Sequence, residues 1–152
     1  MKPRLDLART PTPALRSLLD LSNAVAACGL EKSLLELVKI RASQINGCAY
    51  CLHMHTRDAR ANGESEERIH LLPAWREAPG YSERERAALG WTEALTLVAQ
   101  TRAPDAEYAA VAAQFSAEEQ VNLTLAIATI NSWNRLAVGF RSTPEVRDHA
   151  SR

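Results

Sequence analysis

The feature that most constrains the fold is the regular recurrence of helix start and stop signals along the chain. Two capping-box spacings and two turn pairs stand out: Ser82 with Glu85, Ser116 with Glu119, Asn46-Gly47 and Asn62-Gly63. No segment shows the period-2 alternation of a half-buried strand. These signals predict an all-α protein of about seven helices.

Between these signals, apolar residues recur at helical spacing. The expected helices cover residues 14–28, 31–45, 48–62, 65–72, 82–101, a segment opened by Pro104, and 116–140. We expect the last of these to be central and buried. Its apolar face would carry Val121, Leu125, Ala128 and Leu136, widened by Ile127, Ile130 and Trp133. The frequent alanine and leucine agree with helix, and 152 residues suit a single domain spanning 1–152 with a core of about 14–140.

Charge and hydropathy narrow the range of partners. Lysine plus arginine and aspartate plus glutamate both total 18, so the formal net charge is zero and no nucleic-acid partner is indicated. The N-terminal residues lack the apolar run of a secretory signal, and no apolar stretch is long enough to cross a membrane. We therefore expect a cytoplasmic protein. Three tryptophans, zero net charge and several apolar helix faces predict a homo-oligomer, trimer or hexamer before dimer.

The segment NGCAYCLHMH carries the residues of greatest chemical interest. On a helix, Cys48, Cys51 and His55 share one face. Zinc is one interpretation, but Cys48 and His55 would lie roughly 10 Å apart along the axis, too far to bind one ion together. A structural disulfide is a second, though so short a loop restrains the unfolded chain little. A redox-active dithiol at a helix N-terminus explains the pair better, because that end favours a thiolate.

A carboxylate completes the constellation. Glu36 lies twelve residues before Cys48 on the preceding expected helix. An antiparallel helical hairpin with its turn at Asn46-Gly47 would bring Glu36 back toward the cysteines. A carboxylate and an imidazole beside two thiols have the composition of a proton relay.

The combined spacing of Glu36, Cys48, Cys51 and His55 resembles the signature of the alkylhydroperoxidase D-like (AhpD-like) proteins of the carboxymuconolactone decarboxylase superfamily. The flanking segments KIRASQINGCAYC, MHTRDARANGE, AWREAPGYSERERAALGWTEALT and INSWNRLAV are similar to one branch of its small single-domain members. The resemblance covers residues 31–138 and implies an all-α bundle, cyclic homo-oligomers and thiol-dependent reduction of hydroperoxides by an external dithiol, without cofactor or metal.

The resemblance also implies roles for the four residues. Cys51 would attack the peroxide, Cys48 would resolve the product, and His55 with Glu36 would relay the proton. Helix-end electrostatics alone favours Cys48 as the more acidic thiol. The best-known members carry a histidine where this chain has Tyr50, whose phenol accepts protons poorly at neutral pH. The expected activity is a thiol peroxidase or disulfide oxidoreductase. The alternatives are a non-enzymatic redox sensor or oligomeric stress protein, and a lyase without thiol chemistry.

The remaining polar and sulfur-containing residues are interpreted structurally. Cys28 is expected to be a small core residue, and His53 to lie at the surface or at an interface. Trp75, Trp91 and Trp133 are expected to anchor the core or a subunit contact. A further polar group, Asn131, Asn134 and Arg135, is expected to satisfy buried groups in the last helix.

Overall fold

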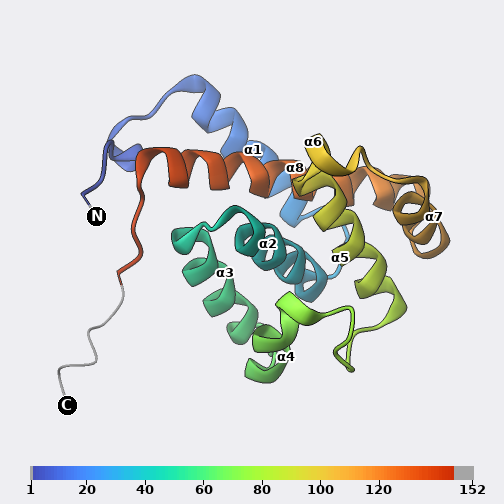
Figure 1. The fold of residues 1–152 in the computed structure, drawn as a ribbon. Helices are drawn as coiled ribbons and strands as arrows, with labels where there is room; N and C mark the ends of the chain where they lie inside the picture. Colours follow the sequence, from blue (N-terminus) through green and yellow to red (C-terminus); the bar gives the residue numbers. More distant parts are fainter. Residues whose placement is uncertain (1, 146–152) are drawn as a thin grey trace, which may run out of the picture.

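A computed structural model describes residues 2–145, and its regular elements are all helical (Figure 1). The α-helices are α1 (Pro13–Ala26), α2 (Lys32–Asn46), α3 (Ala49–Ala61), α4 (Glu66–Leu71), α5 (Glu83–Thr96), α6 (Val98–Thr101), α7 (Asp105–Gln114) and α8 (Ala117–Phe140). Two short 3₁₀ helices cover Leu7–Arg9 and Leu72–Ala74. The predicted all-α class is confirmed. In the described part of the chain, no helix is both long enough and apolar enough to cross a bilayer.

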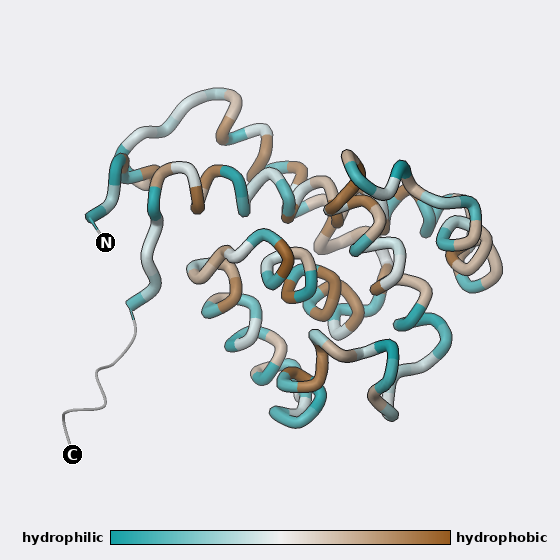
Figure 2. The backbone as a smooth tube through the Cα atoms, viewed as in Figure 1, coloured by the Kyte–Doolittle hydropathy of each residue, from teal (hydrophilic) through white to brown (hydrophobic). Residues whose placement is uncertain are grey.

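Helix α2 lies at the centre of the molecule. It packs against α3, α5 and α8, while α1 lies along α8 (Figure 1). Its side chains Leu37, Val38 and Ile40 are fully buried, and Figure 2 shows hydrophobic residues along the inner helices. Because one helix contacts three others, residues on its different faces reach different parts of the structure.

The predicted helix ends are confirmed where the caps were read from sequence. Both capping boxes form, at Ser82 with Glu85 and at Ser116 with Glu119. Gly47 ends α2 in the left-handed conformation, with φ of 64°, a geometry that glycine adopts without a Cβ penalty. The chain then turns directly into α3, so α2 and α3 form the expected hairpin.

The single helix predicted over residues 82–101 is wrong. Leu97 leaves helical geometry, with φ of −103° and ψ of 30°, and separates α5 from the one-turn α6. The hydroxyl of Thr101 donates to the carbonyl of Ala94 over 2.6 Å, so a side chain takes up a hydrogen-bond acceptor in the last turn of α5. The spacing of apolar residues does not predict a hydrogen bond of this kind.

The apolar face predicted for α8 is confirmed only in part: Ile127 and Ile130, expected to widen it, are buried, but its main row is not. Val121, Leu125 and Ala128 are exposed, whereas the buried face carries Leu123, Ile127, Ile130 and Asn134 among others. A shift of two residues rotates a helical face by about 200°, which is nearly the opposite side. The choice failed because α8 has apolar residues on both sides, and only packing against α1, α2 and α5 decides which side is covered.

Candidate active site

The α2–α3 hairpin brings the predicted carboxylate and imidazole into contact. His55 Nδ1 donates to Glu36 Oε2 over 2.8 Å, and both side chains are buried, about 10% exposed. The two residues are 19 positions apart, so the turn at Gly47 creates this contact. With Nδ1 donating to a carboxylate, Nε2 is the nitrogen left available for proton transfer.

A third residue joins this pair. Lys39 lies one turn after Glu36 on α2, and its Nζ is 2.7 Å from Glu36 Oε1. Burial alone would raise the pKa of the Glu36 carboxyl, but the hydrogen bonds and charges of His55 and Lys39 outweigh burial and lower that pKa below its ordinary value. Glu36 is therefore ionised at neutral pH.

The two thiols lie side by side at the start of α3. Cys48 is the N-cap residue of the helix, and its Sγ accepts the backbone N–H of Cys51 over 3.4 Å. The two Sγ atoms are 2.7 Å apart, and both residues are almost completely buried. The pair is therefore close enough to interconvert between dithiol and disulfide with a small side-chain movement.

The surroundings of the two sulfurs give them different acidities. A hydrogen bond from the Cys51 thiol, together with the backbone N–H, lowers the pKa of Cys48 to about 7 despite burial. The same contact with the Cys48 thiolate, added to burial, raises the pKa of Cys51 above its usual range. The first ionisation thus belongs to Cys48, the order that helix-end electrostatics alone favours.

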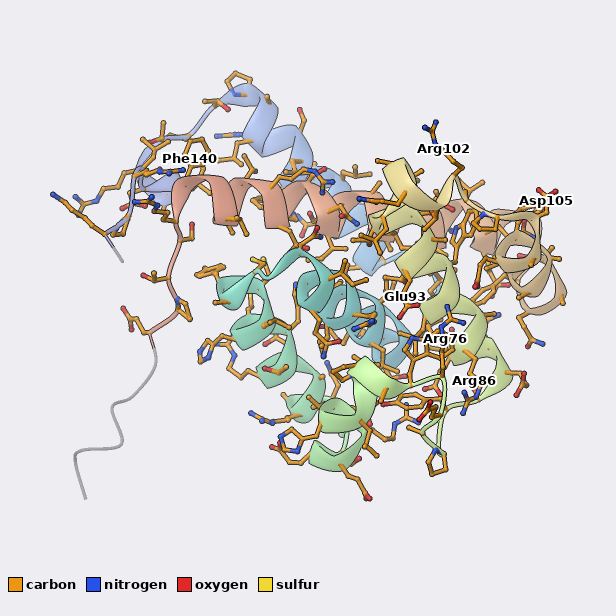
Figure 3. All side chains as sticks on the ribbon, viewed as in Figure 1. Arg76, Arg86, Glu93, Arg102, Asp105 and Phe140 are labelled. Carbon is orange, nitrogen blue, oxygen red and sulfur yellow. The ribbon has the colours of Figure 1, made fainter. Side chains whose placement is uncertain are left out.

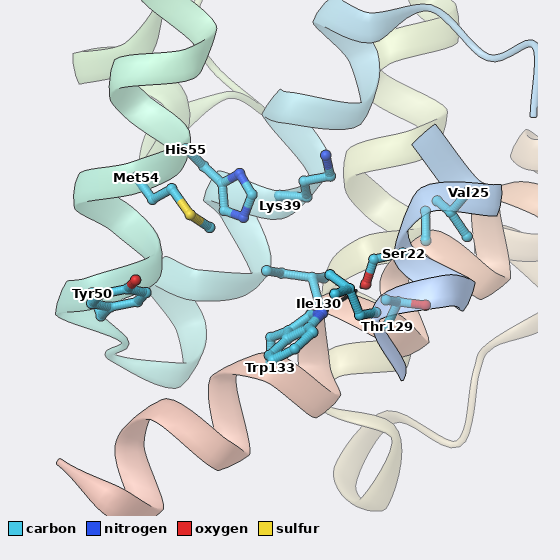
Figure 4. Close-up of a pocket in the computed structure, with 11 residues that line it drawn as sticks. Ser22, Val25, Lys39, Tyr50, Met54, His55, Thr129, Ile130 and Trp133 are labelled. Atoms are coloured by element: carbon cyan, nitrogen blue, oxygen red, sulfur yellow. Dashed lines mark hydrogen bonds between the residues drawn. The ribbon is translucent and has the colours of Figure 1, made fainter. Parts of the chain in front are cut away.

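Two adjoining cavities flank these groups. One, of about 320 Å³, is lined by His55 and Lys39 together with side chains of α1 and α8 (Figure 4). The other, of about 390 Å³, is lined by Cys51 and by the N-terminal segment that precedes α1. Three side chains belong to both walls: Tyr50, Met54 and Trp133. The imidazole and the Cys51 sulfur therefore face neighbouring spaces separated by movable side chains.

The zinc interpretation receives little support from this arrangement. His55 bonds to Glu36, and neither sulfur is hydrogen-bonded to His55 anywhere in residues 2–145. Glu36, His55 and Asp58 do bring three potential ligand atoms within 4.8 Å of one another. The Lys39 ammonium already pairs with the Glu36 carboxylate, and its positive charge opposes the binding of a metal cation beside Glu36.

Several residues of the site were not identified from the sequence. Lys39 is one helical turn from Glu36, so the spacing of an i,i+3 ion pair was available as a signal. Met54 gave no sequence signal, because an isolated methionine does not identify a cavity wall. Trp133 was interpreted as an anchor, yet it lines both cavities, and its indole N–H donates to Ser22 on α1 over 2.8 Å.

The structural interpretations of His53 and Trp75 are confirmed, and that of Cys28 is confirmed in part. Cys28 is half-buried and packs against the core formed by α1, α2, α5 and α8. His53 is exposed on α3. Trp75 is buried in a second apolar cluster with residues of α2 and α5.

Comparison of the sequence with known proteins assigns the chain to a family. Residues 13–94 match the carboxymuconolactone decarboxylase family. The uncharacterized protein YdfG of Bacillus subtilis is 40% identical over 138 residues, which are 91% of this chain and 94% of YdfG.

Solved structures agree with this relationship. A protein of unknown function from Agrobacterium tumefaciens, proposed to be the antioxidant defence protein AhpD, has a TM-score of 0.93 and 47% identity over 96% of this chain and all of that one. An uncharacterized peroxidase-related protein from Silicibacter has a TM-score of 0.77 over 90% of this chain and 72% of its own; at 21% identity it supports the fold alone. The chain belongs to the carboxymuconolactone decarboxylase family and has the AhpD-like fold.

Proposed function

We propose that this protein reduces organic hydroperoxides to alcohols through the Cys48–Cys51 dithiol, with an external dithiol as reductant. The single observation that carries the proposal is the contact between the two Sγ atoms, 2.7 Å apart at a helix N-terminus, where Cys51 lines a cavity. A buried pair with one thiol pKa near neutrality is suited to reversible oxidation. The mostly apolar walls of the Cys51 cavity favour an organic peroxide over hydrogen peroxide.

The reaction begins with a proton transfer. Cys51 lines a cavity and is the sulfur that a peroxide can reach, whereas Cys48 is the thiol that ionises first. The Cys48 thiolate is the nearest acceptor for the Cys51 proton. The Cys51 thiolate then attacks the terminal peroxide oxygen, the O–O bond breaks, and the products are a Cys51 sulfenic acid and an alkoxide.

The second half of the reaction consumes the sulfenic acid. His55 takes up the proton released when Cys48 ionises and gives it to the alkoxide, and Glu36 offsets the positive charge that the imidazole carries in between. The Cys48 thiol condenses with the sulfenic acid and releases water, which leaves a Cys48–Cys51 disulfide. An external dithiol returns both thiols to the reduced state and becomes a disulfide itself.

The decisive experiment is consumption of cumene hydroperoxide with dithiothreitol or dihydrolipoamide as reductant. We expect multiple turnovers from the unmodified chain, and none from Cys48→Ser or Cys51→Ser. Cys28→Ser is the matched control, since Cys28 packs in the core away from this pair, and it should retain activity. A single oxidation that stops although dithiol is present would instead indicate a redox sensor. Equal activity in all three variants would exclude thiol chemistry.

The predicted homo-oligomer stays part of this proposal. Helices α8 and α1 present apolar side chains at the surface: Val121 (59% exposed) and Val138 (49%) on α8, and Leu19 (52%) on α1. Surface of this kind favours association with a second copy. Sedimentation at micromolar concentration should show a trimer or hexamer, and a monomer of 16.7 kDa would contradict this expectation.

A further inference from the structure

Beside the thiols lies a group of buried and partly buried amide side chains that the proposed mechanism does not use. Asn46 ends α2, and Asn131 and Asn134 lie on the inner face of α8. Asn134 is 1% exposed and Asn131 is 8% exposed. Burying an amide costs free energy unless its donors and acceptors are satisfied, so the partners of these groups define their orientation.

The hydrogen bonds fix which end of each amide faces which way. Asn46 Nδ2 donates to Asn131 Oδ1 over 3.0 Å and to Asn134 Oδ1 over 2.9 Å, which uses both of its N–H groups. Arg135 Nη1 also donates to Asn131 Oδ1, over 2.9 Å. Since each Oδ1 already accepts, the Nδ2 of Asn134 must point away from Asn46.

That Nδ2 points toward the dithiol. One of its two N–H groups donates to Ser43 Oγ over 3.0 Å, and Ser43 is the residue whose carbonyl accepts the backbone N–H of Cys48. The α8 residues one turn to either side of Asn134, Ile130 and Ala137, pack in one cluster with Cys48 and Cys51. Asn134 is therefore an immediate neighbour of this cluster, although in residues 2–145 its Nδ2 makes no hydrogen bond to either sulfur while both are thiols.

We propose that Asn134 is the hydrogen-bond donor that stabilises the thiolate of the Cys48–Cys51 pair, held in orientation by Asn46, which donates to its Oδ1, and by Ser43, which accepts from its Nδ2. The bond that Asn46 donates to Asn134 Oδ1 polarises the Asn134 amide, so its N–H groups become better donors. The proximity of the Asn134 amide also lowers the pKa of both thiols. The inference concerns thiol ionisation, and it rests on the proposed function only for its consequence in turnover.

Other charged groups surround the thiols and must be separated from this effect. His55 follows Cys51 by one turn on α3, Glu36 and Lys39 lie on α2, and Asp6 of the N-terminal segment lines the Cys51 cavity. In residues 2–145, none of these four is hydrogen-bonded to either sulfur. A substitution at Asn134 leaves all four in place.

The test is the pH dependence of alkylation by iodoacetamide, supported by thiolate absorbance near 240 nm, with the full chain and no peroxide. Asn134→Leu keeps the volume and removes the donor. Asn134→Asp keeps the acceptor for Asn46 and replaces the donor by a negative charge. We expect the midpoint to rise by about one pH unit in Asn134→Leu, the size of a lost hydrogen bond to a charged group. In Asn134→Asp it should rise further.

Ser43→Ala is the matched control, because it removes the acceptor of one Asn134 N–H but leaves the Asn134 side chain present and its orientation fixed by Asn46. Its midpoint should stay within about 0.3 pH unit of the unmodified chain. Midpoints that do not move in either Asn134 variant, with circular dichroism showing folded protein, would overturn the inference and leave the amides a purely structural role. Should Asn134→Leu fail to fold, the isosteric Asn134→Asp decides by the same criterion.

This experiment separates the inference from the proposed function. A raised midpoint in a protein that never consumes peroxide would retain the role of Asn134 and reject the peroxidase. Peroxide turnover with midpoints that do not move would retain the peroxidase and reject the role of Asn134.

Discussion

Glu36 on α2 is a buried carboxylate and Glu93 on α5 a partly buried one, and the two look alike by the usual criteria. Each is mostly shielded from water, each is paired with a cation, and the pKa of each is lowered although burial alone would raise it. Glu93 accepts from Arg41 at 2.9 Å, from Arg76 at 2.9 Å and from the Trp75 indole at 2.8 Å. Figure 3 shows Arg76 beside Glu93.

The difference between the two lies in their partners. Guanidinium groups keep their proton at any pH a protein experiences, so Glu93 takes part in an arrangement with a single charge state. Glu36 is bonded to His55, which can take up and release a proton, and that pair lines a cavity. A lowered carboxyl pKa therefore does not identify a reactive group, whereas a titratable partner at a cavity wall does.

The largest expected effect is on the stability of the Glu93 network. Glu93→Gln removes the charge that Arg41 and Arg76 share, and should lower the free energy of unfolding by about 3 kcal/mol, as when a buried ion pair loses one member. Thermal and urea unfolding would measure it, with the exposed Glu67→Gln as control. If Glu93→Gln lowers the free energy of unfolding no more than the control does, the Glu93 network has no special role in stability, and the contrast with Glu36 fails.

The next effect concerns Glu36. Glu36→Gln and His55→Ala should each slow the oxidation of Cys51 by about tenfold or more, the lower end of what proton-transfer catalysis contributes. Stopped-flow oxidation by cumene hydroperoxide would measure the rate. The double variant should be little slower than either single one, because both residues act in one relay. Losses that multiply would mean that Glu36 and His55 act independently.

A smaller effect should appear in the pH dependence of stability. The pKa of Cys48 is about 7 in the fold against an ordinary value of 9.0. Between these values the unfolded chain binds more protons, so the free energy of unfolding should rise with pH, by at most about 1.4 kcal/mol per unit. This contribution is absent below pH 7. Chemical unfolding at several pH values would show it, and a Cys48→Ser variant with the same slope would contradict it.

The smallest effect is expected at Lys39. Lys39→Met should slow oxidation by about threefold at neutral pH, since a partly exposed ion pair contributes about 0.2–1 kcal/mol. Without Lys39 the pKa of the Glu36 carboxyl rises, so the loss should grow as the pH is lowered toward 5. Rates of the exposed control Lys32→Met should not change with this pattern. An equal loss at all pH values would assign Lys39 to substrate contact instead.

Local signals predicted much of this structure. Capping boxes and the Gly47 turn located helix ends, and the hairpin they define predicted that Glu36 would meet His55. The exposed side of α8 and the break at Leu97 escaped prediction, because both depend on which surfaces other helices cover. The cavities could not be predicted from the sequence either, because Trp133 and Leu19, which line one of them, come together only in the packed structure.

The sulfur at the start of α3 has a consequence for local motion. Several other helices begin at a hydroxyl, from Thr12, Ser65, Ser82 or Ser116, whereas α3 begins at Cys48. An anionic sulfur accepts the Cys51 amide well, but a disulfide sulfur is a weak acceptor. Oxidation should thus loosen the first turn of α3, and hydrogen–deuterium exchange at the Cys51 amide should be slow in the reduced protein and faster in the oxidised one. The exchange rate in the first turn of α3 would then indicate whether the Cys48–Cys51 pair is reduced or oxidised.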